Sequence, residues 1–242
     1  MNVLILAAGK PNPELADSYP LCLTEIEGSP LIERILGACA RLNPSKIIVA
    51  IRREDARRHH LDNVVKLLCA NAEVVTVSDK VQGAACSALL AAPYTDNDEP
   101  LLILNGDSLL TVDFATVIND FMARQLDAGT IAFPSVHPRY SYVRLDENGL
   151  VVEAAEKNPI SREATAGFYW YRHGKDFVAA AKSMIRKDAN VGGFYFICPA
   201  FNELVLKHQR IGIFRIEGKQ YHQLKTEKQV NLYYAQMDQE RG

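Results

Sequence analysis

Short apolar runs alternate with longer segments of helical periodicity along the first half of the chain. The apolar runs are nearly continuous, as is typical of buried strands, and they cover residues 2–8, 46–51, 73–77 and 100–105. The predicted helices cover residues 31–39, 53–70, 84–92 and 114–126. Ser29 is the expected N-cap of the first helix, with Pro30 at its first position. Strands that alternate with helices predict an α/β fold with a mostly parallel, doubly wound, Rossmann-like sheet.

The second half of the chain has a different pattern, which is rich in predicted β-strands. Asn148-Gly149 lies between two alternating runs within residues 141–156, which predicts a hairpin. Further strands are predicted over residues 165–171 and 211–216, and helices over 176–187 and 226–236. A capping box at Thr226 opens the last helix. Neither a linker nor a repeat interrupts the sequence, so we expect one domain, residues 1–242, with a small β-rich sub-region.

Charge and cysteine usage argue against several classes of protein. The 27 Lys and Arg nearly balance the 29 Asp and Glu, and a net charge of -2 argues against a nucleic-acid partner. The cysteines are odd in number and widely spaced, so we expect free, mostly buried thiols rather than zinc ligands or disulfides: Cys22, Cys39, Cys69, Cys86 and Cys198. No apolar run reaches the roughly 18 residues of a membrane span. The N-terminal segment lacks the basic start of a signal peptide, and we expect a cytoplasmic protein.

Two strand ends are the first candidates for a binding site, because ligands of doubly wound sheets bind beyond the carboxyl ends of the strands. Gly9 follows the first strand, and Ala8-Gly9 lets a ligand approach the backbone; the alternative is an ordinary tight turn. Asp107 follows the fourth strand and can hold a divalent cation; the alternative is an Asx turn or a helix cap.

Other polar positions carry weaker signals. Gln82-Gly83 opens a helix, where an amide can read a base edge and the helix end favours anions. Lys157 follows Glu156 at the end of the hairpin and can hold a phosphate, although such a pair more often lies on a solvated surface. His59-His60 has no acidic or cysteine partner at ligand spacing, and we assign it to a solvated helix face.

Taken in order, several short motifs resemble those of the sugar-nucleotidyltransferases, which are sugar-1-phosphate nucleotide pyrophosphorylases. The motifs are Leu6-Ala7-Ala8-Gly9, Tyr19-Pro20-Leu21, Gly28-Ser29-Pro30-Leu31-Ile32, Gln82-Gly83-Ala84, Leu104-Asn105-Gly106-Asp107, Glu156-Lys157, Ala166-Gly167 and Asn202-Glu203-Leu204. Each motif is weak by itself, but the ordered set covers nearly the whole chain. The resemblance implies a glycosyltransferase-A-like fold in which residues 1–135 bind nucleotide and residues 136–242 bind the acceptor.

The resemblance also implies a reaction and a set of site residues. A sugar-1-phosphate oxygen attacks the α-phosphorus of an NTP, pyrophosphate leaves, and Mg2+ bridges the phosphates. The implied nucleotide-binding residues are Leu6, Ala7, Ala8, Gly9, Gln82, Gly83, Asn105 and Gly106. The implied metal ligands are Asp107 and Gln223, the implied catalytic groups are Lys10, Asp107 and Lys157, and the implied acceptor contacts are Glu156 and Gly167.

The chain departs from the family pattern at three places. The loop after the first strand usually reads Gly-x-Gly-x-Arg, whereas here Gly9 is followed by Lys10-Pro11-Asn12-Pro13. Lys10 can replace the lost arginine in part. Leu21 stands where the family has a lysine. The second metal carboxylate, an Asp before Gly-Thr, is absent from residues 222–226, which offer Gln223 or His222 instead.

Three functional hypotheses stay open at this point. The first is a nucleotidyltransferase acting on an NTP and a phosphorylated acceptor, in the family's usual setting of surface polysaccharide synthesis. The second is a degenerate member that binds nucleotide or sugar without catalysis, because the loss of two cations weakens the grip on phosphate. The third, a nucleotide-sugar glycosyltransferase, lacks the usual Asp-x-Asp at Asp107-Ser108-Leu109. A homo-oligomer is compatible with each.

Overall fold

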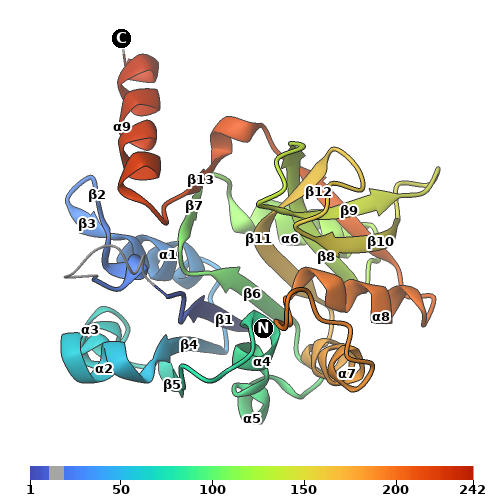
Figure 1. Cartoon of the computed structure of the whole chain (residues 1–242), viewed down its shortest axis with the longest axis horizontal. Helices are drawn as coiled ribbons and strands as arrows, with labels where there is room; N and C mark the ends of the chain where they lie inside the picture. The colour runs from blue at the N-terminus through green and yellow to red at the C-terminus, as the bar shows by residue number, and fades with distance from the viewer. Residues whose placement is uncertain (11–18, 242) are drawn as a thin grey trace.

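A nine-stranded sheet organises the part of the chain that this computed structural model describes, residues 1–10 and 19–241 (Figure 1). Four of its strands are parallel neighbours in the order β5-β4-β1-β6: β1 (Asn2–Ala7), β4 (Lys46–Arg52), β5 (Glu73–Val77) and β6 (Leu101–Asn105). The apolar runs therefore form neighbouring strands, and the predicted α/β, doubly wound fold class is confirmed.

One antiparallel strand connects this parallel part to the β-rich sub-region. β11 (Glu163–Tyr171) pairs with β6 and also with β8 (Ala128–Pro134) and β9 (Ser141–Leu145). The sub-region is completed by β10 (Val151–Glu156) beside β9 and by β12 (Ile211–Arg215) beside β8. The predicted hairpin is confirmed, because Gly149 takes the positive φ of +76° that the turn between β9 and β10 requires.

Two short antiparallel pairs and three short helices complete the framework. β2 (Glu25–Ile26) pairs with β3 (Ser29–Pro30), and β7 (Ser108–Leu110) pairs with β13 (Tyr221–Gln223). The 3-10 helices of the described residues are η1 (Leu21–Leu23), η2 (Cys198–Ala200) and η3 (Gly218–Gln220). Because β7 directly follows β6, its pairing with β13 brings a C-terminal segment beside the end of a central strand.

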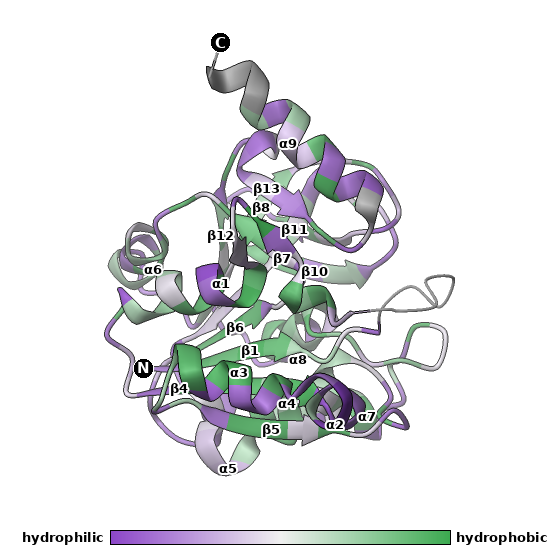
Figure 2. Cartoon of the chain, turned by 90° about the vertical axis from the view of Figure 1, so that its left-hand side faces the viewer, coloured by the Kyte–Doolittle hydropathy of each residue, from purple (hydrophilic) through white to green (hydrophobic). Residues whose placement is uncertain are grey.

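Helices cover both faces of the sheet, which therefore has two hydrophobic cores (Figure 2). Alternate strand residues point to opposite faces, so Val3 and Ile5 belong to one core and Leu4 to the other. The first core is covered by α1 (Leu31–Ala40), α3 (Leu61–Leu68) and α6 (Phe114–Ala123). The second is covered by α4 (Ala84–Leu89), α7 (Gly174–Arg186) and α8 (Phe201–Val205).

The predicted start of the first helix is wrong by one residue. Ser29 and Pro30 lie in β3, opposite β2, so their backbone is extended rather than helical. Pro30 is the N-cap and Leu31 begins α1, with no capping hydrogen bond from a side chain. The Leu31 N–H is satisfied by the Thr24 carbonyl at 2.9 Å instead. Strand pairing has replaced side-chain capping at this helix end.

Three predicted helices end early or are interrupted. The helix over residues 53–70 is divided into α2 (Arg53–His59) and α3, because His60 takes a left-handed φ of +50°. The helix over residues 84–92 ends at Leu89, before α5 (Ala92–Thr95), whose Pro93 has no N–H to continue the α4 pattern. α6 ends at Ala123 because Gln125, at φ +54°, turns the chain into β8.

The last helix, α9 (Glu227–Arg241), begins where the capping signal predicts. The Gln229 N–H donates to Thr226 Oγ1 at 3.3 Å, as in a capping box. The Gln229 side chain accepts from the Lys225 N–H at 2.9 Å, one residue before the expected Thr226 N–H. This arrangement fixes the segment between β13 and α9, which lies beside the site described below.

Asn202, part of one of the motifs, fastens β10 to α8. Its side-chain amide accepts from the Ala154 N–H and donates to the Ala154 carbonyl, both at 2.8 Å. We expect Asn202→Ala to lower the free energy of unfolding by about 1 to 3 kcal/mol, because both backbone groups lose their partner. Chemical denaturation measures this, with the exposed helical Asn63→Ala as matched control. Equal stability of the two variants would contradict the assignment.

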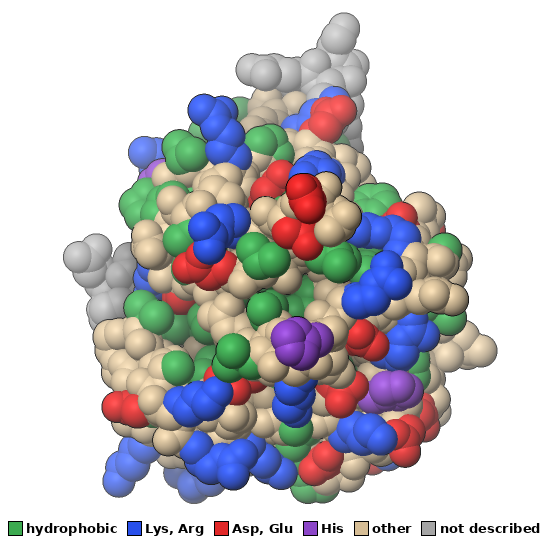
Figure 3. All heavy atoms as spheres, turned by 90° about the vertical axis from the view of Figure 1, so that its right-hand side faces the viewer, with side chains coloured by type: hydrophobic (Ala, Val, Ile, Leu, Met, Phe, Trp, Pro, Cys, Tyr) green, Lys and Arg blue, Asp and Glu red, His purple; other side chains and the backbone are tan. Residues whose placement is uncertain are grey.

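The cysteines are free thiols in the structure, as the sequence predicts. Burial raises the pKa of Cys22 and of Cys39 to about 12. Basic and acidic side chains are interspersed on the face shown in Figure 3. Among the ion pairs of the structure, Lys182 lies 3.6 Å from Asp96 and Lys187 lies 2.7 Å from Glu203. None of the helices in the described residues is long and apolar enough to cross a membrane.

Candidate functional site

A cleft of about 410 Å³ lies beyond the carboxyl ends of the parallel strands, where the doubly wound topology predicts a ligand site. One wall is formed by the ends of β1, β5 and β6 and by the start of α4. The opposite wall is formed by β10, β11 and residues 194–197, and β13 closes one side. The cleft is therefore built from both halves of the sequence.

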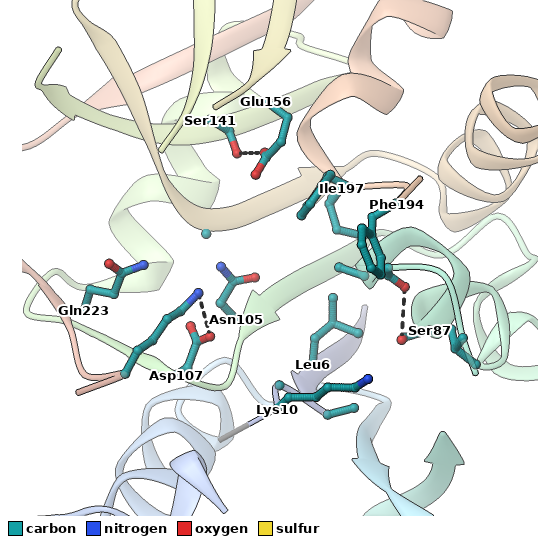
Figure 4. Close-up of a pocket in the computed structure, with 18 of the residues that line it drawn as sticks. Leu6, Lys10, Ser87, Asn105, Asp107, Ser141, Glu156, Phe194, Ile197 and Gln223 are labelled. Carbon is teal, nitrogen blue, oxygen red and sulfur yellow. Dashed lines mark hydrogen bonds and ion pairs between the residues drawn. The ribbon is translucent and has the colours of Figure 1, made fainter. Parts of the chain in front are cut away.

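Most of the residues singled out from the sequence come together here. The predicted residues that line the cleft are Leu6, Ala8, Gly9, Lys10, Gly83, Asn105, Asp107, Glu156, Lys157, Gly167 and Gln223. Figure 4 shows Glu156 beside Ser141 at one end and Asp107 near Gln223 at the other. The roles assigned to these residues stay predictions, but their proximity in space follows from the fold.

Three predicted nucleotide-binding residues are not among the lining residues. Ala7 is buried in a core below the cleft. Gly106 donates its N–H to the Leu6 carbonyl at 2.9 Å, and a Cβ at this position would lie 2.9 Å from Ala7. Gln82 has an exposed side chain, and its carbonyl accepts from the Tyr195 N–H. In this structure Gly106 and Gln82 act through backbone hydrogen bonds, and Ala7 packs in the core.

Gly167 has a clear steric function. It has a φ of +71°, and a Cβ there would lie 2.5 Å from Asn105 Nδ2. The register of β11 with β8 also shifts between Thr165 and Tyr169. Glycine therefore allows β11 to bulge beside Asn105 at the floor of the cleft.

The wall formed by β10 and β11 carries a half-buried carboxylate and a lysine that forms no ion pair within the described residues. Glu156 accepts a hydrogen bond from Ser141 Oγ, and burial raises its pKa despite that bond and the nearby Lys157. Lys157 has a left-handed φ of +54°, and its Nζ lies 5.0 Å from the centroid of the Phe196 ring. In the described part of the chain no carboxylate forms an ion pair with Lys157, so its charge is free to meet an anion.

Glu156 should make the stability of the protein depend on pH. Its raised pKa means that the folded state binds the proton more tightly than the unfolded chain, whose ordinary value is 4.5. The wild type therefore loses stability as the pH rises from 4.5 through the raised value. We expect Glu156→Gln to be more stable than wild type at about pH 8, with the gain shrinking toward about pH 4.

Denaturation curves over this pH range test the expectation. The exposed hairpin variant Glu147→Gln is the control, and it should show no such pH-dependent gain. A gain from Glu156→Gln that stays constant with pH would contradict the proposed cost of the buried charge.

At the other end of the cleft, the groups predicted to hold magnesium contact other partners. Asp107 Oδ2 lies 3.0 Å from Lys225 Nζ, and Oδ1 is buried without a hydrogen-bond partner in the described residues. Gln223 Oε1 accepts from Gln229 Nε2 at 3.0 Å. Throughout residues 1–10 and 19–241, no group of three or more His, Cys, Asp or Glu is placed to hold a metal ion.

Sequence reasoning missed several cleft residues. Arg52 ends β4, so the strand-end rule that selected Asp107 could have found it; its guanidinium lies within 3.3 Å of Glu54, Asp55 and Asp79. Arg139 and Lys225 also line the cleft. They come from irregular segments far along the chain, where only a three-dimensional arrangement reveals a common site.

The loop that departs from the family pattern is described only at its start. Lys10 is exposed at the edge of the cleft, and Pro11, Asn12 and Pro13 lie outside the described residues. Leu21 can be placed: its Cδ1 lies 3.6 Å from the position of a Cβ on Gly9. An apolar side chain therefore lies beside the end of β1, near Asp107.

Solved structures share this fold. The nucleoside-diphosphate-sugar pyrophosphorylase from Vibrio cholerae superposes with a TM-score of 0.79 at 17% identity, over 97% of this chain and 100% of that one. A putative glucose-1-phosphate thymidylyltransferase from Bacillus anthracis gives a TM-score of 0.75 at 20% identity, over 97% and 94% of the two chains. At these identities the similarity establishes the fold alone.

Comparison of the sequence with known proteins identifies the family as well as the fold. The chain is 23% identical over 177 residues to the bifunctional protein GlmU of Methanococcus aeolicus, covering 72% of this chain and 40% of that protein. A GlmU of Cupriavidus metallidurans is 26% identical over 168 residues, covering 69% and 35%. The chain thus spans well under half the length of these relatives. The sequence model of the nucleotidyl transferase family matches residues 5–238, nearly the whole chain. With its strand-end cleft and ordered motifs, the chain belongs to the nucleotidyl transferase family.

Proposed function

We propose that the protein transfers a nucleoside monophosphate from an NTP to a phosphorylated small molecule, of which a sugar-1-phosphate is the expected case. The observation that carries the proposal is the meeting of Asp107 and Lys157 in one cleft, from opposite halves of the sequence. A phosphate oxygen of the acceptor attacks the α-phosphorus, the bond from that phosphorus to the β-phosphate oxygen breaks, and pyrophosphate leaves with the electron pair. Such chemistry depends mainly on positioning and charge neutralisation.

Each wall of the cleft has a part in this proposal. Leu6, Ala8 and Gly9 would face the nucleotide, because their small or apolar side chains leave backbone groups accessible. Glu156 would contact the acceptor, and the free Lys157 ammonium would hold its phosphate. The expected setting is the cytoplasm, where NTPs are available, and the expected product serves surface polysaccharide synthesis. A homo-oligomer is part of the same expectation.

Magnesium is the cofactor expected from the family resemblance, but the ligands predicted for it do not fit a metal ion in this arrangement. One Asp107 oxygen is paired with an ammonium group, and the other is buried from solvent. The Gln223 carbonyl is already hydrogen-bonded. An NTP can bring its own Mg2+, and we derive no step from a protein-bound ion.

The proposal is tested by incubating the protein with CTP, UTP, GTP or dTTP and a panel of sugar phosphates, with Mg2+, while pyrophosphate release is measured. We expect release with at least one pair, and the reverse reaction from the matching nucleotide-sugar. Failure of every pair would contradict it.

A second candidate function is nucleotide binding without turnover. It is favoured by Leu21 at the family's lysine position and by the Lys225–Asp107 pair at the expected metal position. Thermal-shift screening separates the two functions, because a bound nucleotide raises the melting temperature whether or not it reacts. Stabilisation without pyrophosphate release would favour the binding protein.

A further inference from the structure

Lys225 has a fixed position at the end of the cleft. The pairing of β13 with β7 sets Gln223 opposite Ser108, and the Leu224 N–H donates to the Asp107 carbonyl at 2.9 Å. The Lys225 N–H is bound by Gln229, at the start of α9. Strand pairing on one side and the Gln229 side chain on the other therefore hold the Lys225 backbone beside Asp107.

The lysine ammonium has hydrogen-bonding capacity left for a ligand. Its Nζ lies 3.0 Å from Asp107 Oδ2, and its side chain is 43% exposed and lines the cleft. An ammonium group has three N–H donors, and Asp107 Oδ2 accepts from one of them. Asp107, which is only 16% exposed, holds the ammonium at the wall while the other donors can reach a ligand.

Lys225 also lies near the place where Leu21 stands instead of the family's lysine. Leu21 Cδ1 and Asp107 Oδ2 lie 3.6 and 3.7 Å from the position of a Cβ on Gly9, so an apolar side chain and the carboxylate flank one point at the end of β1. The Lys225 ammonium is paired with the Asp107 carboxylate, so a residue near the C-terminus places a cation close to the end of β1.

We propose that the Lys225 ammonium, held by Asp107, is the phosphate-binding cation at this end of the cleft, in place of a protein-bound divalent ion. The inference rests on the proposed function, since the phosphate is that of its nucleotide. Asp107 is then a positioning residue, and a phosphate oxygen accepts the free N–H groups of Lys225. The Lys225–Asp107 pair is neutral overall, so it attracts phosphate less strongly than a divalent ion does. Its N–H groups orient the bound phosphate through hydrogen bonds.

Two binding measurements test this inference. Calorimetric titration with CTP, UTP, GTP and dTTP in EDTA should show binding of at least one by the wild type. Lys225→Ala should weaken that binding by about tenfold or more, since it removes a charge-assisted hydrogen bond. Lys228→Ala, an exposed lysine in α9 outside the cleft, is the matched control and should leave the affinity unchanged.

The second measurement uses Mn2+ alone, followed by electron paramagnetic resonance. The wild type should leave Mn2+ free, whereas Gln223→Asp with Lys225→Gly, which restores the carboxylate and glycine of the family pattern, should bind it. Wild-type Mn2+ binding that Asp107→Asn abolishes would overturn the inference.

The outcomes separate this inference from the proposed function. Wild-type nucleotide binding only with Mg2+, or equal binding in EDTA by the wild type and Lys225→Ala, overturns the role of Lys225 and leaves the nucleotidyltransferase proposal intact. No binding of any NTP in either buffer overturns both.

Discussion

Replacing Lys157 by alanine is expected to lower kcat/KM by about 100- to 1,000-fold, with the NTP and acceptor that the wild type uses. Lys157 lines the cleft, and its Nζ lies 5.0 Å from the centroid of the Phe196 ring. Because no carboxylate of residues 1–10 and 19–241 forms an ion pair with Lys157, a phosphate that binds there does not have to displace one. Its left-handed φ of +54° and the 3.0 Å hydrogen bond from its N–H to the Tyr140 carbonyl fix the direction of the side chain.

Steady-state kinetics measure this effect, and two further variants serve as controls. Lys157→Arg keeps the charge and should retain part of the activity, while Lys219→Ala removes an exposed lysine outside the cleft and should change nothing. A Lys157→Ala enzyme with wild-type kcat/KM would remove Lys157 from the site.

Replacing Gly83 by alanine should lower the free energy of unfolding by about 3 kcal/mol or more. Gly83 has φ +103° and ψ 174°, a region that only glycine enters readily. A Cβ there would lie 2.3 Å from the Tyr195 carbonyl oxygen. The Tyr195 carbonyl accepts from the Ala85 N–H at 3.0 Å, and the Tyr195 N–H donates to the Gln82 carbonyl. The added methyl group would therefore strain both of these hydrogen bonds.

Gly149→Ala is the matched control, because Gly149 also has a positive φ but has nothing within 4 Å of a Cβ. It should cost only about 1 to 2 kcal/mol for the backbone conformation. Chemical denaturation compares the two variants, and thermal-shift titration reports nucleotide binding. We expect Gly83→Ala also to weaken binding, since Phe194 and Phe196 on either side of Tyr195 line the cleft. Equal costs for the two glycines would refute the steric argument.

The sheet is the part of the fold that the sequence predicts best. Four apolar runs become β1, β4, β5 and β6 because a strand buried on both faces needs apolar side chains on both. Helix ends are harder to predict, since they depend on non-glycine residues such as His60 and Gln125 in left-handed conformations. Tertiary packing, rather than local propensity, selects those conformations.

In the candidate site, too, some residues could be predicted from the sequence and others could not. Gly9 and Asp107 were predictable because both follow apolar strands, and the strand-end rule applies to them directly. Lys225 was not, because its place beside Asp107 depends on β13 pairing with β7 across more than a hundred residues. The sequence motifs lack two of the family's cations, and Lys225, which lies outside those motifs, adds one to the cleft.

The pairing of β11 limits where chimeras of related proteins can be joined. Its residues 168–171 pair with β6, residues 163–165 and 169–171 pair with β8, and residues 163–164 pair with β9. A chimera that takes residues 1–135 from one relative and the rest from another therefore cuts through hydrogen-bonded strand pairs rather than between modules. Swapping acceptor preference by grafting should succeed best when β6, β8 and β11 come from the same parent, so that the bulge at Gly167 still meets its own Asn105.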